Sequence, residues 1–289
     1  MTCYVFPGQG SQKVGMGEDV FEKFPDKVSI ANEILGYDIK KVCLEDPNNE
    51  LNQTQVTQPA LFIVSALSYL AYQEENNTPP LFVAGHSLGE YNALFAANVI
   101  DFETGIKLVK KRGDLMSKAT GGSMAAIIGI SAEQIQAILI DNKLDDIDIA
   151  NFNEPKQTVI SGESARISQA KPIFEAAGVR RYIPLAVSGA FHSRYMEAAK
   201  QEFETYLDSF TFLQPSIPVV ANVTADIYSQ PAVKTLLSKQ ITHSVRWVDS
   251  IAYLFNQNVE EFIEIGPGKV LTGLINKIKL SLKENSISN

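Results

Sequence analysis

The chain has 289 residues, of which 45% are hydrophobic and 20% charged, a composition typical of globular proteins with a large buried core. Its formal net charge of −8, without any run of basic residues, argues against a nucleic-acid-binding surface. The two cysteines, Cys3 and Cys43, are too few for a disulfide framework and form no C-x-x-C metal motif, which favours a reducing compartment.

The first residues, "MTCYVFPGQG", form a predicted strand and turn and lack the basic and apolar regions of a signal peptide. No apolar run in the sequence reaches the roughly 18 residues that a membrane span needs. We therefore expect a cytoplasmic protein that has no membrane partner.

Short apolar runs alternate with amphipathic segments of helical length, which predicts an α/β fold with a mainly parallel sheet. Strands are predicted at Cys3–Phe6, Leu81–Ala84, Pro218–Ala221 and Phe262–Ile265. Helices are predicted at Ala60–Tyr72, Leu88–Ala97, Phe102–Lys118 and Arg246–Asn256. Asp101 is expected to be the N-cap of the third helix, because its carboxylate can accept hydrogen bonds from unpaired amides.

The middle of the chain predicts a separate unit. From Met124 to Val187 the pattern is β-α-β-β-α-β, the order of a ferredoxin-like arrangement. Gly121, Gly122 and Gly189 flank it as expected hinges. The predicted organisation is therefore an α/β-hydrolase-like core, residues 1–123 and 188–289, with a small ferredoxin-like subdomain inserted at residues 124–187.

A G-x-S-x-G pattern, "GHSLG", places Ser87 between the apolar run "LFVA" and an amphipathic helix. This is the strand–turn–helix context of a nucleophile elbow, in which small flanking residues allow a sharp turn and the helix N-terminus offers amides to an oxyanion. By itself the pattern indicates an enzyme that forms an acyl-serine. The alternative is a chance match in a glycine-rich turn.

The general base must come from three histidines. His86 is adjacent to Ser87 on the tight turn, where neighbouring side chains diverge, so it is expected to brace the turn. His243 lies in the polar segment "ITHSVRW" and is expected at the surface. His192, in "SGAFHSRYM", follows the predicted strand "YIPLAV" and opens a helix, which is the position that a catalytic histidine needs.

A third, acidic member of a triad is not evident. The acidic residues between Ser87 and His192 fall in "LDDIDI", which is assigned to the subdomain and is typical of a solvated edge. A Ser–His dyad is sufficient if backbone carbonyls hold the imidazole in the correct tautomer.

These segments together resemble the malonyl-CoA:acyl carrier protein transacylases. The resemblance covers nearly the whole chain, and it is closest to the discrete, trans-acting acyltransferases of polyketide synthases. The motifs that carry it, in chain order, are "FPGQGSQKVGMG", "TQPALFIVSAL", "GHSLGEYNAL", "IDFETGIKLVKKRGDLM", "GGSMAAIIG", "NFNEPKQTVISG", "SGAFHSRYM" and "IEIGPGKVLTGL".

The resemblance implies a role for several residues. Ser87 matches the acylated serine and His192 its general base. Gln9, in "PGQGSQ", matches the glutamine near the oxyanion hole, and the amide of Leu88 matches the oxyanion donor. Gln240, in "SKQITHSVRW", matches the residue whose backbone carbonyl orients the histidine, which accounts for the missing acid.

Two further residues bear on the substrate. Arg112, in "KKRGDLM", matches the arginine that pairs with the malonyl carboxylate, and a guanidinium can grip a carboxylate through two parallel hydrogen bonds. Without the resemblance, Arg112 would be interpreted as a solvent-exposed basic residue on a helix. Phe191 matches a bulky aromatic residue that restricts the pocket near the malonyl α-carbon and so favours plain malonyl over methylmalonyl. A phenylalanine packed in the core is compatible with that role.

The remaining motifs indicate no cofactor and no metal. "GQGSQKVG" and "GPGKVLTGL" lack the spacings of dinucleotide-binding and Walker loops. Asn151 and Asn153, in "ANFNEP", are expected either to line the cleft or to form a turn. Basic side chains are expected to dock the acidic carrier protein, with these candidates: Lys110, Lys111, Arg180 and Arg181.

The implied reaction is transfer of malonyl from malonyl-CoA, through Ser87, to the phosphopantetheine thiol of an acyl carrier protein in polyketide or fatty-acid synthesis. Two alternatives stay open. One is a hydrolase that clears acyl groups from carrier proteins, against which Arg112 argues because uncharged acyl chains give the guanidinium no partner. The other is a non-catalytic scaffold, against which the intact set of site residues argues.

Overall fold

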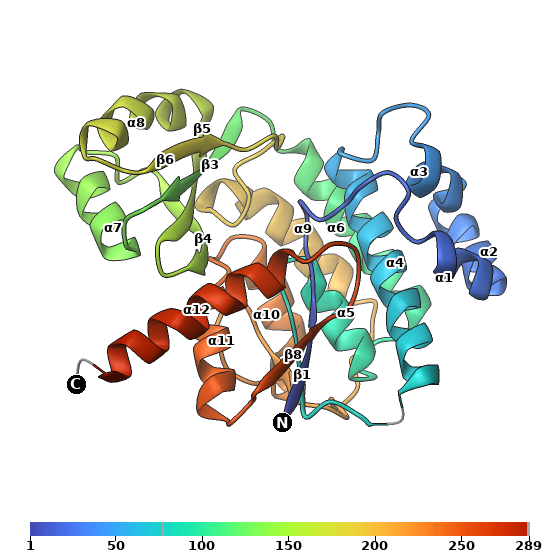
Figure 1. The fold of residues 1–289 in the computed structure, drawn as a ribbon. Coiled ribbons are helices and arrows are strands. Elements are labelled where there is room, and N and C mark those ends of the chain that lie inside the picture. Colours follow the sequence, from blue (N-terminus) through green and yellow to red (C-terminus); the bar gives the residue numbers. More distant parts are fainter. Residues whose placement is uncertain (77, 288–289) are drawn as a thin grey trace.

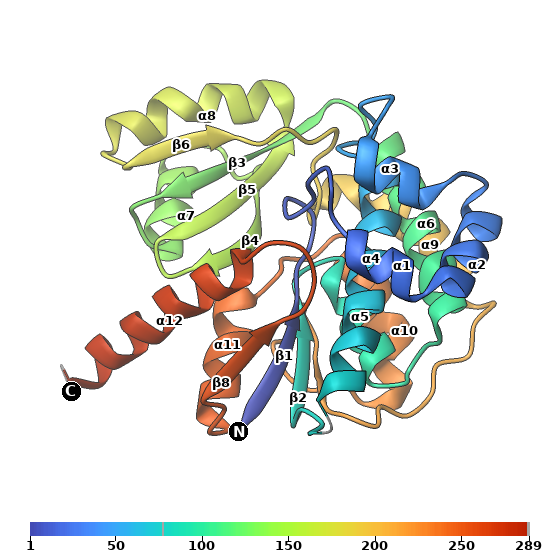
Figure 2. The same ribbon diagram turned by 45° about the vertical axis from the view of Figure 1, so that its right-hand side comes forward.

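The larger sheet consists of four parallel strands in the order β7-β2-β1-β8. Figure 2 shows β2, β1 and β8 side by side. The computed structural model describes residues 1–76 and 78–287. The first and last residues of every strand lie within one residue of the predicted ones. The strands are β1 (Thr2–Phe6), β2 (Phe82–Gly85), β7 (Val219–Val220) and β8 (Glu261–Glu264).

Helices flank this sheet on both faces. Their bounds are α1 (Glu18–Lys23), α2 (Pro25–Leu35), α3 (Ile39–Glu45), α4 (Thr54–Glu75), α5 (Gly89–Ala96), α6 (Phe102–Lys118), α9 (Glu197–Leu207), α10 (Val233–Gln240), α11 (Trp247–Asn256) and α12 (Val270–Ile287). Short 3-10 turns precede α9 and α10, at η1 (Arg194–Met196) and η2 (Gln230–Ala232). Among the described residues, no helix has both the length and the apolarity that crossing a bilayer requires.

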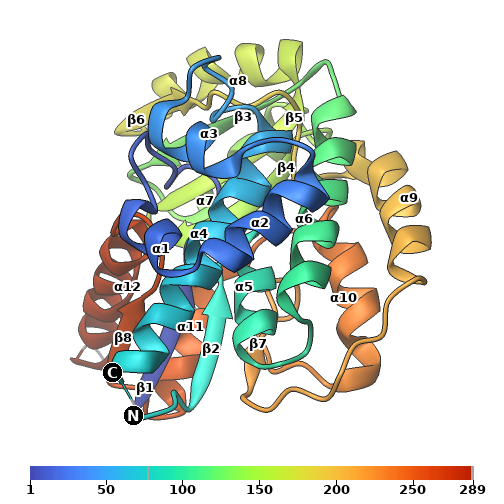
Figure 3. The ribbon, with the colours of Figure 1, turned by 90° about the vertical axis from the view of Figure 1, so that its right-hand side faces the viewer.

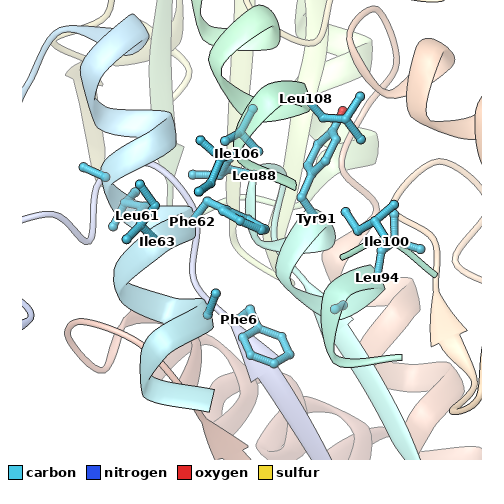
Figure 4. Packing of buried hydrophobic residues seen from close by; sticks show 14 of the residues in the cluster. Phe6, Leu61, Phe62, Ile63, Leu88, Tyr91, Leu94, Ile100, Ile106 and Leu108 are labelled. Carbon is cyan, nitrogen blue, oxygen red and sulfur yellow. The ribbon is translucent and has the colours of Figure 1, made fainter. Parts of the chain in front are cut away.

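The pleat of β1 divides the core into two layers. Cys3 and Val5 point to the face that packs against α11 and α12. Tyr4 and Phe6 point to the other face, which packs against α4, α5 and α6. Figure 4 shows this second layer, where Phe6 lies below side chains from α4 and α5. Outside it, α1 and α2 pack on α4 and α6 (Figure 3).

Helix α6 has the predicted bounds, and Asp101 caps it by accepting a hydrogen bond of 2.7 Å from the Thr104 amide. Helix α4 differs, because it begins at Thr54 rather than Ala60 and continues through Pro59. Proline removes a single helical hydrogen bond, and burial of this part of α4 against α6 compensates for the loss. The prediction was wrong here because tertiary packing overrides a local breaker.

A helix was predicted to open at His192, and α9 begins at Glu197 after the 3-10 turn η1. Four other helices were not among the predicted elements: α1, α2, α3 and α10. The sequence nevertheless carries signals for some of them. Pro25 starts α2, and Gly36 ends it in the left-handed conformation. Asp38 then caps α3 by accepting a hydrogen bond of 3.0 Å from the Lys41 amide. Capping residues therefore mark these short helices more clearly than their apolar periodicity does.

The second sheet is antiparallel, in the order β4-β5-β3-β6, and it lies beside the carboxyl ends of the larger sheet (Figures 1 and 2). Helices α7 and α8 cover one of its faces. Its elements are β3 (Gly122–Ile128), α7 (Ala132–Asp141), β4 (Asp148–Glu154), β5 (Gln157–Glu163), α8 (Ser164–Ala176) and β6 (Arg181–Pro184). The predicted fold class, a parallel α/β core with an inserted ferredoxin-like unit, is confirmed. The division at residues 124 and 187 stays a prediction.

Strand β4 connects the small sheet to the segment of the core that precedes α11. The Phe152 amide donates to the carbonyl of Val245 at 2.9 Å, and the Val245 amide donates to the carbonyl of Ala150 at 2.9 Å. This parallel bridge holds the edge of the small sheet against the segment that precedes α11. Side chains on β4 are thereby placed beside the residues that follow β2.

Candidate active site

The predicted site residues meet at the carboxyl edge of the parallel sheet. Ser87 follows β2 and Gln9 follows β1, and Asn222, which was not predicted, follows β7. Parallel strands end at the same edge of a sheet, so segments that lie far apart in the sequence converge there. This edge faces the small antiparallel sheet.

The turn between β2 and α5 is sharp, and Ser87 has a φ of 50° in it. Such a left-handed conformation is uncommon for a residue other than glycine. The two flanking glycines are required by close contacts. A Cβ on Gly85 would lie 1.9 Å from the carbonyl carbon of Gly89, and a Cβ on Gly89 would lie 2.0 Å from the Phe6 oxygen. These glycines let the serine turn pass directly against the neighbouring backbone.

We predict that Gly89→Ala destabilises the protein by at least about 1–3 kcal/mol, because the new methyl group meets backbone that cannot move aside. Gly273→Ala is the matched control, since Gly273 lies in α12 with open space around it. The control should stabilise the protein by about 0.5–1 kcal/mol. Urea unfolding measures both, and equal free energies of unfolding for the two variants would contradict the close-contact argument.

His192 lies with its imidazole between Ser87 and Gln240. Its Nε2 is 2.8 Å from Ser87 Oγ, and its Nδ1 is 2.7 Å from the backbone oxygen of Gln240. A carbonyl can only accept a hydrogen bond, so Nδ1 carries the proton and the Nε2 lone pair faces the serine. Burial, with a smaller contribution from the positive charge of Arg112, lowers the pKa of His192 to about 3. The imidazole is therefore neutral, and able to accept a proton, at neutral pH.

Arg112 projects from α6 into the same site and is only 1% exposed. Its guanidinium donates to Gln58 Oε1 at 2.8 Å, to Gln240 Oε1 at 2.9 Å and to Ser87 Oγ at 3.1 Å. All three acceptors are neutral. Within the described ranges, Arg112 Nε has no hydrogen-bond partner and no carboxylate lies within ion-pair distance of the guanidinium. Such a buried cation favours an anionic ligand.

A cavity of about 100 Å³ opens beside these groups. The core lines it with Ser87, His192 and Arg112, and the small sheet contributes Met124 from β3 and Asn151 from β4. Apolar side chains complete the wall: Leu88, Met116, Leu185, Val187 and Phe191. A serine hydroxyl, a neutral imidazole and a buried guanidinium thus share a small, partly apolar cavity, which is an arrangement suited to acyl transfer of a short anionic acyl group.

Residues 3–285 match the model of the family described as the acyl transferase domain. The chain belongs to this acyl transferase family. The polyketide biosynthesis malonyl CoA-acyl carrier protein transacylase PksC of Bacillus subtilis is 55% identical over 280 residues, which cover 96% of this chain and 97% of PksC.

Solved structures agree with the family assignment. The malonyl CoA-acyl carrier protein transacylase from Burkholderia pseudomallei is 47% identical, with a TM-score of 0.93 over 96% of this chain and 98% of that one. A malonyl-transacylase in complex with its type II PKS acyl-carrier protein is 39% identical, with a TM-score of 0.91 over 96% of this chain and 92% of the other. The predicted family resemblance is confirmed.

In this acyl transferase, Gln9 and Leu88 both line the cavity. Gln9 donates from its side-chain amide to Thr54 Oγ1 at 3.3 Å, a long hydrogen bond. The main-chain amides of Gln9 and Leu88 donate no hydrogen bond to any other described residue. Two unpaired amides at the end of β1 and before α5 are the groups that an oxyanion requires.

The other two histidines lie as expected from their positions in the sequence. The ring of His86 turns away from the serine, with Nε2 2.8 Å from Asn153 Oδ1 and its plane edge-on to Trp247. It therefore connects the serine turn to β4. His243 is exposed, and its Nδ1 lies 2.9 Å from the carbonyl oxygen of Lys239. Asn151 and Asn153 both belong to β4, so the alternative that they form a turn is wrong.

Two of the acidic side chains in "LDDIDI" pair with arginines and not with His192. Asp146 pairs with Arg166 at 2.6 Å, and Asp148 pairs with Arg194. No acidic side chain among the described residues contacts the imidazole, and the Gln240 carbonyl occupies the place where a triad acid would lie.

The four basic residues named as docking candidates do not form one patch. Lys110 donates to the main-chain carbonyls at the end of α2, at 2.8 and 3.2 Å, and Lys111 lies 3.8 Å from Glu202. Arg180 and Arg181 are exposed at the start of β6, on the small sheet. Lys110 is therefore engaged within the protein rather than free to meet a partner.

Sequence reasoning missed three buried polar residues around the site: Gln58, Glu90 and Asn222. Gln58 was hidden because the predicted helix began after it. Asn222 carried a usable signal, since it follows a buried strand at the edge where Ser87 lies. Glu90, inside "GHSLGEY", resembled an ordinary acidic residue in the first turn of a helix.

Proposed function

We propose that this acyl transferase moves malonyl from malonyl-CoA to the phosphopantetheine thiol of an acyl carrier protein. The observation that carries the proposal is Arg112, a buried guanidinium without a carboxylate partner among the described residues, placed 3.1 Å from Ser87 Oγ. A malonyl carboxylate supplies the missing negative charge when its thioester reaches the serine. The names of the relatives described above support the same substrate and acceptor.

In the first step, Ser87 Oγ attacks the thioester carbonyl carbon while His192 Nε2 takes the serine proton. The negative charge that develops on the carbonyl oxygen is stabilised by Gln9 and by the Leu88 amide. The carbon–sulfur bond then breaks, and His192 returns the proton to the departing CoA sulfur. Malonyl is left as an ester on Ser87, with its carboxylate on Arg112.

In the second step, the phosphopantetheine thiol attacks the ester carbonyl and loses its proton to His192. Collapse of the intermediate breaks the bond to Ser87 Oγ, which takes the proton back from His192. The carrier protein leaves as malonyl thioester, and the free enzyme is restored. The Gln240 carbonyl keeps Nδ1 protonated throughout, so the same nitrogen, Nε2, serves both steps.

Phe191 sets the size of the acyl group in this proposal. It is buried beside His192 and lines the cavity. The bulk of its ring near the malonyl α-carbon favours an unsubstituted malonyl group. A pocket that rejects one additional methyl group discriminates by about 1–3 kcal/mol.

The pathway and location are part of the proposal. The 55% identity to a polyketide biosynthesis transacylase supports a role in polyketide synthesis, with fatty-acid synthesis as the alternative pathway. A cytoplasmic location is supported by Cys3 and Cys43, which are both buried and unpaired.

The test is acylation of Ser87. After incubation with malonyl-CoA, we expect intact-mass and peptide mass spectrometry to find one malonyl group, on Ser87, and addition of holo carrier protein to move it to the carrier. Ser87→Ala is expected to form no adduct. Absence of a malonyl adduct on the wild-type protein would instead support a scaffold. Hydrolysis of acetyl-carrier protein faster than malonyl transfer would support a hydrolase.

A further inference from the structure

Glu90 is a buried carboxylate beside the nucleophile that the two-step mechanism does not use. It lies in the first turn of α5, three residues after Ser87, and is fully buried. One of its oxygens, Oε2, accepts a hydrogen bond of 2.7 Å from the Asn222 amide. The other, Oε1, accepts a hydrogen bond from the Tyr228 hydroxyl. Both oxygens therefore hold the segment that follows β7.

Asn222 in turn holds the serine turn. The Ser87 amide donates to its Oδ1 at 2.7 Å, and its Nδ2 donates to the Gly85 carbonyl at 2.6 Å. The Asn222 side chain thus connects the Gly85 carbonyl and the Ser87 amide, which lie on either side of His86 in the turn between β2 and α5. A second amide side chain, that of Gln240, donates to the Ser87 carbonyl at 3.0 Å.

These contacts act on a strained residue. A non-glycine residue held in the left-handed conformation costs about 1–3 kcal/mol and persists only where the surroundings hold it. The direction of Ser87 Oγ, and so its 2.8 Å contact with His192, depends on that backbone conformation. Local sequence does not supply the restraint, because the Asn222 amide that bridges the turn is 135 residues away.

We propose that Glu90 is a positioning residue, whose carboxylate holds the Asn222 backbone so that the Asn222 side chain keeps Ser87 aimed at His192. The proposal rests on the proposed function only in taking Ser87 as the nucleophile. Glu90 acts through its two acceptor oxygens and not through its charge. It touches neither substrate nor the reacting atoms.

The burial of Glu90 supports a specific role. Burial raises the pKa of Glu90 to about 7, against the lowering effects of the hydrogen bonds with Tyr228, Asn222 and Gln240 and of the positive charge of Arg112. A carboxyl group without solvent contact is costly unless its hydrogen bonds are satisfied, and an apolar side chain would pack here at lower cost. The position therefore favours a residue that offers two acceptors.

The experiment compares Glu90→Gln with Glu90→Met. Glutamine keeps both hydrogen bonds, since its oxygen accepts from Asn222 and the Tyr228 hydroxyl can accept from its NH2 group. Methionine keeps the volume and removes both acceptors. The measured quantity is the rate of Ser87 labelling by a neutral fluorophosphonate, followed beside malonyl-CoA acylation. We expect the labelling rate and kcat of Glu90→Gln to stay within about 3-fold of wild type. For Glu90→Met we expect both to be about 10- to 100-fold lower, with KM for malonyl-CoA nearly unchanged.

Asn222→Ala should slow labelling to a similar extent, and the double variant Glu90→Met, Asn222→Ala should be no slower than Asn222→Ala alone. Tyr228→Phe, which leaves the Asn222 hydrogen bond in place, is the matched control and should stay within about 3-fold of wild type. Thermal unfolding and circular dichroism check that each variant is folded.

Several results would overturn the proposal. One is an equal loss in Glu90→Gln and Glu90→Met, which would assign the effect to charge. Another is an unchanged rate in Glu90→Met, or losses that multiply in the double variant. If Glu90→Met does not fold, an unchanged rate of Ser87 labelling in folded Asn222→Ala would also overturn the proposal. Because the fluorophosphonate needs no Arg112, slow labelling of the variants together with no malonyl adduct in wild type would defeat the proposed function and leave the positioning role standing.

Discussion

Arg112→Ala is expected to lose the preference for malonyl-CoA. The guanidinium is buried and its nearest partners are neutral, so only an anionic acyl group pairs with it. Removing it takes away about 2–5 kcal/mol of the interaction with the malonyl carboxylate, which is roughly a 30- to 4,000-fold slower acylation of Ser87 by malonyl-CoA. Acylation by acetyl-CoA, which has no carboxylate to pair, should change far less.

The measurement is a competition of malonyl-, methylmalonyl- and acetyl-CoA for Ser87 in the wild-type protein and in the variant. Lys107→Ala is the matched control, because Lys107 is a half-exposed cation on the same helix, paired with Glu103 across one turn. It should leave selectivity unchanged. Arg112→Lys keeps the charge but not the two parallel donors, and its preference for malonyl-CoA should lie between that of wild type and that of Arg112→Ala. An unchanged malonyl preference in Arg112→Ala would refute the carboxylate clamp.

His192→Ala is expected to slow acylation by about 10²- to 10⁴-fold, because no other described side chain is placed to accept the Ser87 proton. His243→Ala is the control, since the His243 side chain is exposed and lies against the Lys239 carbonyl, and the substitution keeps the His243 backbone, which hydrogen-bonds to His192. Its activity should match wild type. Stopped-flow or quenched-flow acylation with malonyl-CoA measures both variants, and a small effect of His192→Ala would show that another group is the base.

The pH dependence of the wild-type enzyme gives a second readout for His192. In the proposed mechanism the neutral imidazole is the base, so activity requires a pH above the pKa of His192. Burial and the nearby Arg112 lower that pKa from 6.5 to about 3. We therefore expect kcat/KM for malonyl-CoA to stay flat as the pH falls from 8 through 6.5 toward 5. A half-maximal rate near the ordinary histidine value would contradict a buried, neutral base.

Much of the fold follows from local patterns in the sequence. The four strands of the parallel sheet were recognisable from apolar runs that end in turns, and α6 from its apolar spacing and the Asp101 cap. The order of elements in the inserted unit was sufficient to predict its sheet. Errors occurred where packing outweighs a local signal, as at Pro59 in α4, or where helices are too short for a clear period, as in α1 and α3.

The site divides in the same way. Ser87 could be found from the residues that surround it in the sequence, because the two close-packed glycines and the following helix are local features. His192, Arg112 and Gln240 received roles only through a family resemblance that spans the chain. Their distances to Ser87 come from packing of α6, α10 and the segment before η1 at one edge of the sheet.

The serine turn, the parallel core and the inserted sheet could be predicted from local patterns, since each depends on neighbours along the chain. What restrains the serine and how the arginine is paired became visible only in the folded protein. Asn222 reaches the serine turn from 135 positions away and is held by Glu90 from 132 positions away, and Arg112 meets Gln58, Ser87 and Gln240 from three other elements. Such long-range hydrogen bonds leave no periodic trace in a sequence, because they depend on how separate elements pack and not on the order of residues within any one of them.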